Sequence, residues 1–140
     1  MTRNDIVEMF ESRRAAYDRQ DAGALASDYA DECIIESPTG GTHEGRDAAR
    51  RVIQTVFDAL DVKLKQQSLI VDGDFVAQVV NLQGKDIGAF LGMSPTGKPF
   101  DVPGVFLFEL RNKKIVRERR IYDFTSLLLQ TGLLKAKPAN

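Results

Sequence analysis

The chain has 140 residues, 43% of them hydrophobic, and its 19 Lys and Arg nearly balance its 20 Asp and Glu. This length predicts one domain with one core, and the composition is ordinary for a globular protein. The near-neutral charge provides no field of one sign, so neither nucleic acid nor an anionic membrane is expected as a partner.

The sequence also argues against a membrane protein, a secreted protein and a zinc protein. No apolar stretch is long enough to span a bilayer, and the acidic residues near the N-terminus do not fit a secretory signal. The only cysteine, Cys33, excludes an intrachain disulfide, and one cysteine with one histidine, His43, argues against a zinc site. We therefore expect a cytoplasmic protein without a metal, in which Cys33 is a buried thiol.

Helical spacing of apolar residues predicts three helices in the first part of the chain. The first covers residues 4–19, with Asn4 as its cap, the second opens at Asp21, and the third covers residues 46–60. Between the second and third helices, residues 33–36 are typical of a short strand, which a proline and a glycine pair then stop.

From Leu64 onward the pattern is typical of β-structure. An Asp-Gly-Asp turn at residues 72–74 separates two of the predicted strands, which are 68–71, 75–82, 100–110 and 115–124. Helices followed by an antiparallel meander predict an α+β fold, with a curved sheet wrapped over the helices and a cavity on its concave face. We expect a single domain over residues 1–134 and a loose tail at 135–140.

A set of aromatic residues is predicted to face this cavity. Phe106 and Phe108 share a strand face, and Tyr17, Phe57 and Tyr122 can join them. Such a set forms either plain core or the wall of a ligand pocket. The polar groups of Tyr17, Tyr122 and Ser37 favour a pocket for a small hydrophobic molecule.

Asp123 is the candidate catalytic residue, and two interpretations of it remain open. Flanked by Tyr122 and Phe124, the carboxylate is expected to be partly desolvated, which raises its pKa and suits a proton carrier near neutral pH. Alternatively, Asp123 only caps the short helix that follows, through the amide of Thr125 or Ser126.

Because side chains alternate along a strand, the direction of Asp123 also determines which charged residues of strand 115–124 point into the cavity. If Tyr122 points into the cavity, Glu118 and Arg120 point inward with it and Asp123 points outward. If Asp123 points inward, two arginines of the same strand do so as well. A bulge near Ile121 is the third possibility, because it brings both Tyr122 and Asp123 to the cavity mouth.

Two further features carry alternative hypotheses. Ser37 and His43, oriented by Glu36 or Glu44, form a possible nucleophilic pair, against the simpler interpretation of an exposed loop histidine. The loop at residues 83–94 is predicted to lie over the cavity mouth and gate it.

Several motifs together resemble the nuclear transport factor 2-like superfamily. Residues 29–32 (Tyr-Ala-Asp-Glu), 35–38 (Ile-Glu-Ser-Pro) and 45–46 (Gly-Arg) are similar to its helix–strand–helix signature, and the match covers nearly the whole chain. Within it, the turn at residues 95–98 and the ending at 122–133 resemble the SnoaL-like polyketide cyclases. The resemblance implies a cone-shaped α+β fold with a hydrophobic pocket in the cone, often a homodimer through the sheet.

The same resemblance implies an activity. Asp123 matches the acid/base aspartate of the cyclases, which transfers protons in an intramolecular aldol closure of a polyketide ester without cofactor or metal. The expected function is a cofactor-independent enzyme of the cyclase/isomerase type that acts on a small hydrophobic, oxygenated ligand. The alternative is a non-catalytic small-molecule-binding or dimeric accessory protein on the same fold.

The chain departs from the related ketosteroid isomerases at their acid and base positions. Ser37 stands where those enzymes carry the general-base aspartate, and Gly104 stands where they carry the second acid. Arg13 falls at the position of their helix-1 tyrosine, with Tyr17 one turn later. Because a serine hydroxyl is a very weak base, we do not expect isomerase chemistry of that kind.

Overall fold

The computed structural model describes residues 1–139, so Asn140, the end of the predicted tail, lies outside the described residues. All of its helices and strands lie within residues 1–134. In chain order they are α1 (Arg3–Asp18), α2 (Ala22–Ala26), β1 (Tyr29–Ser37), β2 (Gly41–Glu44), α3 (Arg46–Leu60), β3 (Lys63–Asp72), β4 (Phe75–Lys85), the 3-10 helix η1 (Phe90–Gly92), β5 (Pro99–Arg111), β6 (Lys114–Tyr122) and α4 (Phe124–Thr131).

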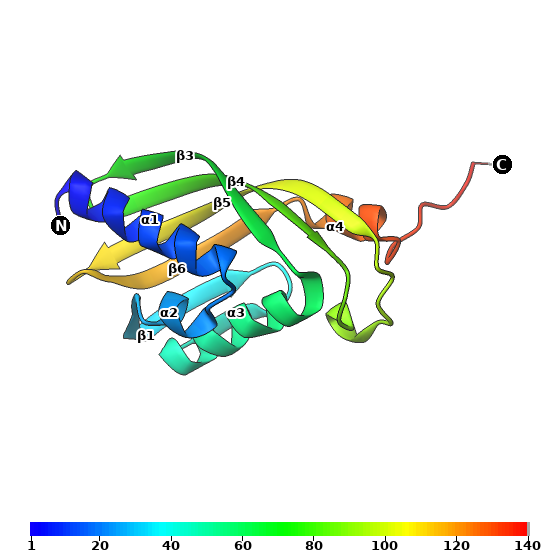
Figure 1. The fold of residues 1–140 in the computed structure, drawn as a ribbon, viewed down its shortest axis with the longest axis horizontal. Coiled ribbons are helices and arrows are strands. Elements are labelled where there is room, and N and C mark those ends of the chain that lie inside the picture. The colour runs from blue at the N-terminus through cyan, green and yellow to red at the C-terminus, as the bar shows by residue number, and fades with distance from the viewer. Residues whose placement is uncertain (140) are drawn as a thin grey trace.

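Six strands form one sheet in the order β2-β1-β6-β5-β4-β3 (Figure 1). Strands β3 to β6 form the predicted antiparallel meander, but β1 and β6 run parallel. The sequence predicted β1 as a short strand but did not predict this parallel pairing. β1 and β6 are far apart in sequence, and parallel strands are not joined by a hairpin turn, so the sequence contains no local signal for this pairing.

The three N-terminal helices cover one face of this sheet (Figure 1). α1 packs against β3, α3 packs against β1 and β2, and α2 packs against both other helices. The curved sheet and its helices make the predicted cone-shaped α+β fold. The enclosed core is apolar, and its most deeply buried side chains include Ile6, Phe10, Leu25, Ile35, Ile53, Val76, Val80, Val102 and Ile115.

The starts of the first two helices and the strand β2 test the local sequence predictions. α2 opens at Asp21 as predicted. The predicted cap of α1 at Asn4 is wrong, because the helix begins one residue earlier and Thr2 and Asp5 form its reciprocal capping box. β2 was missed because its sequence, Gly-Thr-His-Glu, has no apolar residue to mark a strand. It pairs with β1 across the turn that follows Pro38, so His43 lies on a strand and not in a loop.

None of the helices within residues 1–139 is both long enough and apolar enough to cross a membrane.

Candidate functional site

The inward side chains of β6 decide which residues face the cone. β6 pairs with β5 in unbroken register from Tyr122, opposite Gly104, to Glu118, opposite Phe108. Glu118 and Arg120 are buried, Tyr122 is half-buried and Asp123 is exposed. The first of the three alternation hypotheses is therefore confirmed, and no bulge forms near Ile121.

Glu118 is the centre of a buried polar network. The Arg120 Nε donates to Glu118 Oε2 at 2.6 Å, and the Tyr29 hydroxyl donates to Oε1 at 2.9 Å. The side chains of Glu118 and Arg120 are only 2% and 7% exposed. Each carboxylate oxygen thus has its own donor, which is what a buried charge requires.

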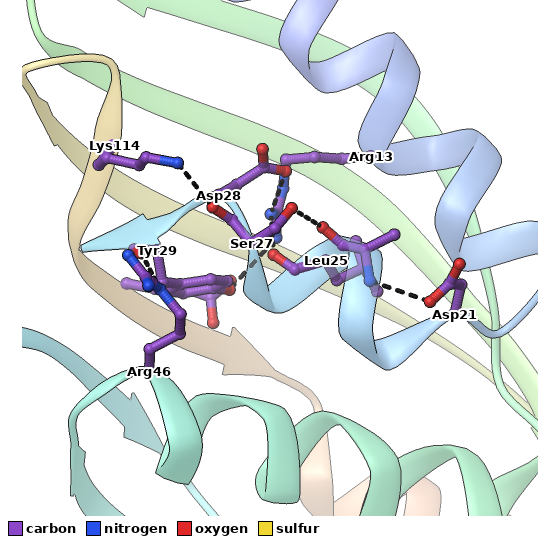
Figure 2. A network of polar contacts seen from close by, with 10 residues as sticks. Arg13, Asp21, Leu25, Ser27, Asp28, Tyr29, Arg46 and Lys114 are labelled. Atoms are coloured by element: carbon purple, nitrogen blue, oxygen red, sulfur yellow. Dashed lines mark hydrogen bonds and ion pairs between the residues drawn. The ribbon is translucent and has the colours of Figure 1, made fainter. Parts of the chain in front are cut away.

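Arg13 extends the network across the helices (Figure 2). Its Nη1 donates to the Leu25 carbonyl and to Asp28 Oδ2, both at 3.1 Å, and its Nη2 donates to the Tyr29 hydroxyl at 3.2 Å. One guanidinium on α1 therefore binds the end of α2, the start of β1 and, through Tyr29, Glu118 on β6.

The pKa shifts in this network follow from burial and charge. Burial opposes the charge of Arg120, but the Glu118 carboxylate holds the pKa of Arg120 above its ordinary value. Burial and the same carboxylate raise the pKa of Tyr29, so its hydroxyl stays protonated and donates. Glu118 is thus fully engaged by neighbours and is not a free base.

The aromatic residues predicted for the pocket pack tightly inside the cone. Tyr17 contacts Phe57 edge-to-face with ring centroids 5.1 Å apart, and burial raises the pKa of Tyr17. Phe108 contacts Phe10 in the same way at 4.9 Å, and the Arg120 guanidinium lies 5.9 Å from the Phe106 centroid. The cavity bordered by Tyr17, Phe106 and Phe108 has a volume of about 10 Å³, which is room for one water and not for a substrate.

The remaining two predicted residues, Ser37 and Tyr122, lie nearer the edge of the cone. The Ser37 hydroxyl bonds to the Thr39 hydroxyl at 3.1 Å, and the structure gives it no bond to His43, so the nucleophilic pair is not formed. Tyr122 contacts Phe124, which in turn contacts Phe90 of η1. Tyr122 therefore belongs to an aromatic row that joins β6, α4 and η1.

Asp123 lies outside the cone and caps α4. Its Oδ1 accepts from the Ser126 amide at 3.0 Å, and its Oδ2 accepts from the Ser126 hydroxyl at 2.8 Å. These two bonds lower the pKa of Asp123. The predicted desolvation with a raised pKa is therefore wrong, because the side chain is exposed, and the capping interpretation is confirmed. A catalytic role for Asp123 stays a prediction.

A large cavity lies along α3. It has a volume of about 630 Å³, and we call it the α3 cavity. Its apolar surface includes Val52 and Val56 of α3 and Phe90 of η1. Its polar side chains come from α3 and from the turn and strand after β1: Thr39, His43, Arg51, Thr55 and Asp58.

The loop that carries η1 is anchored firmly at its base. Asp86 is fully buried, and its Oδ2 accepts from the Thr96 amide and hydroxyl at 2.9 and 3.1 Å. The amides of Ile87 and Gly88 donate to the Ala59 carbonyl at the end of α3. The loop borders the α3 cavity instead of the predicted cavity on the concave face of the sheet, and gating by it stays a prediction.

Sequence reasoning offered inward-facing Glu118 and Arg120 as one alternative, but it missed their partners Arg13 and Tyr29 and the α3 cavity. The network had a signal, because Arg13 interrupts the apolar face that Ile6, Phe10 and Tyr17 form on α1. The cavity had none, because it depends on how α3, η1 and the turn after β1 meet. Within residues 1–139, no cluster of three or more His, Cys, Asp or Glu side chains is arranged to hold a metal ion.

A family model for SnoaL-like polyketide cyclase matches residues 7–131. The chain belongs to the SnoaL-like polyketide cyclase family. This confirms the resemblance seen in the sequence motifs, including the wider nuclear transport factor 2-like fold. No curated protein matches the sequence.

Solved structures agree with this fold at low sequence identity. TsrD from Streptomyces laurentii is 23% identical with a TM-score of 0.84, and the match covers 96% of this chain and 99% of that one. A protein from Xanthomonas campestris pv. campestris, proposed to be a polyketide cyclase, is 20% identical with a TM-score of 0.84, covering 92% and 98%. A ketosteroid isomerase-like protein from Catenulispora acidiphila, in complex with trimethylamine, is 21% identical with a TM-score of 0.78, covering 99% and 100%.

The ion network predicts a large effect of Glu118→Gln on stability. The substitution keeps the shape but removes the negative charge that compensates Arg120, so we expect the free energy of unfolding to fall by about 3 kcal/mol. Urea denaturation measures this. Glu36→Gln is the matched control, because Glu36 pairs with Arg117 and Arg119 at the surface and its loss should cost far less. Equal losses in the two variants would contradict the network's role.

The cap at Asp123 predicts a pH-dependent effect on the melting temperature. The pKa of Asp123 is lower in the folded protein, so its stabilisation is complete above the unfolded value of about 4 and is lost as the pH falls through the folded value. Asp123→Ala should therefore lower Tm at pH 7, and its difference from wild type should shrink in acid. Asp123→Asn retains a cap and should lie closer to wild type at pH 7. A difference that does not change with pH would contradict this assignment.

Proposed function

We propose that this chain binds a small hydrophobic, oxygenated molecule in the α3 cavity. The observation that carries the proposal is the cavity itself. At about 630 Å³ its volume lies in the range typical of small-molecule sites, and it combines an apolar wall with a few polar groups. The small cavity beside Tyr17, Phe106 and Phe108 supports the same choice, because its volume of about 10 Å³ admits no such ligand.

The positions of the two candidate carboxylates support a binding function more than a catalytic one. Glu118, the carboxylate inside the cone, is occupied by Arg120 and Tyr29, and Asp123 caps a helix in solvent. Neither carboxylate lines the α3 cavity. Binding needs only the cavity.

Catalysis by Asp123 is the second candidate, and the family match favours it. As in the sequence resemblance, Asp123 would act as general acid/base in an intramolecular aldol closure of a polyketide-type ester. Asp123 directly follows Tyr122, whose aromatic row reaches Phe90 at the wall of the α3 cavity. A ligand that extends from the cavity along this row would approach the carboxylate.

We also propose a homodimer through the outward face of the sheet. Val79, Val105 and Ile121 lie side by side across β4, β5 and β6 on this face. Leu107 and Ile70 continue the apolar surface, and they are 39% and 57% exposed. A second copy of the chain would cover this area.

Ligand binding is tested with N-phenyl-1-naphthylamine, an uncharged apolar fluorophore. The wild type should bind it with an increase in fluorescence, and Val52→Phe should weaken the affinity about tenfold by filling the cavity. Arg50→Phe is the control, since Arg50 is exposed on α3 and does not line the cavity. Absence of binding to the wild type, or equal effects of the two variants, would refute the proposed site.

Catalysis is tested by hydrogen–deuterium exchange at C2 of methyl acetoacetate, which reports proton abstraction next to a carbonyl. If Asp123 is a base, the wild type should accelerate the exchange and Asp123→Asn should reduce that acceleration about a hundredfold. Asp72→Asn, at the turn between β3 and β4, is the control and should match the wild type. Exchange that is unaffected by Asp123→Asn would eliminate the catalytic role.

A further inference from the structure

The polar side chains that line the α3 cavity include one arginine and one histidine. His43 and Arg51 line it, and among residues 1–139 neither takes part in an ion pair. Asp47 lies one helical turn before Arg51, yet no ion pair joins them. The guanidinium of Arg51 therefore keeps its charge available at the cavity wall.

The opposite charge lies farther along the same helix. Asp58 also lines the cavity, but its Oδ1 already accepts from Gln54 Nε2 at 2.8 Å. Seven residues separate it from Arg51, which corresponds to about 10 Å along the helix axis. The cavity thus has a positive end and a negative end.

The positive end coincides with the N-terminal part of α3. Ala48, in the first turn of the helix, lines the cavity together with Arg51. The dipole of a helix of this length adds a partial positive charge at that end, which favours an anion there over a cation.

His43 is held at this end by the turn after β1. A side chain added at Gly40 would come within 2.7 Å of His43 Nε2, so the imidazole lies directly against a residue that has no side chain. His43 is half-buried on β2, opposite Ile35 of β1. The turn therefore packs the ring at the cavity wall.

We propose that the α3 cavity takes an amphipathic organic anion, with its carboxylate or equivalent acidic group on Arg51 and His43. The apolar body of the ligand lies over Val52, Val56 and Phe90. Asp58 repels the acidic group from the far end, so the ligand has one orientation. This inference rests on the proposed binding function and specifies the class of ligand.

The test compares two fluorophores that share one aromatic skeleton. 1-Anilinonaphthalene-8-sulfonate carries an anionic sulfonate, and N-phenyl-1-naphthylamine is its uncharged counterpart. Arg51→Gln should weaken the affinity for the sulfonate about fivefold and change that for the uncharged probe less than about twofold. Arg51→Lys should restore most of the difference, because it keeps the charge.

Arg50→Gln is the matched control, since it removes the same charge from the neighbouring residue, which does not line the α3 cavity. It should leave both affinities unchanged. Gly40→Ala displaces the imidazole of His43 and should weaken the affinity for the sulfonate probe but not that for the uncharged probe.

The outcomes separate the two proposals. If the uncharged probe binds in the cavity but Arg51→Gln affects both probes equally, or Arg50→Gln weakens the sulfonate as much, the anion inference is overturned and the binding function stands. If the wild type binds neither probe, the binding function fails and this inference fails with it. Melting temperatures of all variants exclude unfolding as the cause.

Discussion

The structure depends on the ion network around Glu118. Strand alternation forces Glu118 and Arg120 into the cone together with Tyr122, and burying two charges is costly unless every polar atom finds a partner. Tyr29 and Arg120 supply donors to both oxygens of Glu118, and Arg13 binds Tyr29 from α1. The same contacts that compensate the charges therefore fix α1 and β1 relative to β6.

This network also determines where a ligand can go. Arg13, Glu118 and the rings of Tyr17, Phe106 and Phe108 surround a cavity of only about 10 Å³ inside the cone. The free volume lies instead beside α3, where β2 is only four residues long. Large side chains therefore fill the space around Glu118, and the space for a ligand lies along α3.

The sequence predicts the elements of this fold better than the contacts between them. Periodicity located α3 and the Asp-Gly-Asp motif located the β3–β4 turn, because both signals depend on neighbours along the chain. The parallel pairing of β1 with β6 and the polar strand β2 depend on distant partners, which spacing does not encode. Similarly, alternation predicted that Glu118 would accompany Tyr122 inward, but its partner Tyr29 lies 89 residues away.

Asp123 shows how one carboxylate faces two incompatible demands. As a helix cap it must stay ionised and accept from Ser126, and these bonds lower its pKa. As a general base it must be strong enough to take a proton near neutral pH, and a lowered pKa makes it weaker. Proton abstraction would therefore require a substrate that displaces Ser126 and excludes water. The proposed binding in the α3 cavity requires no such rearrangement.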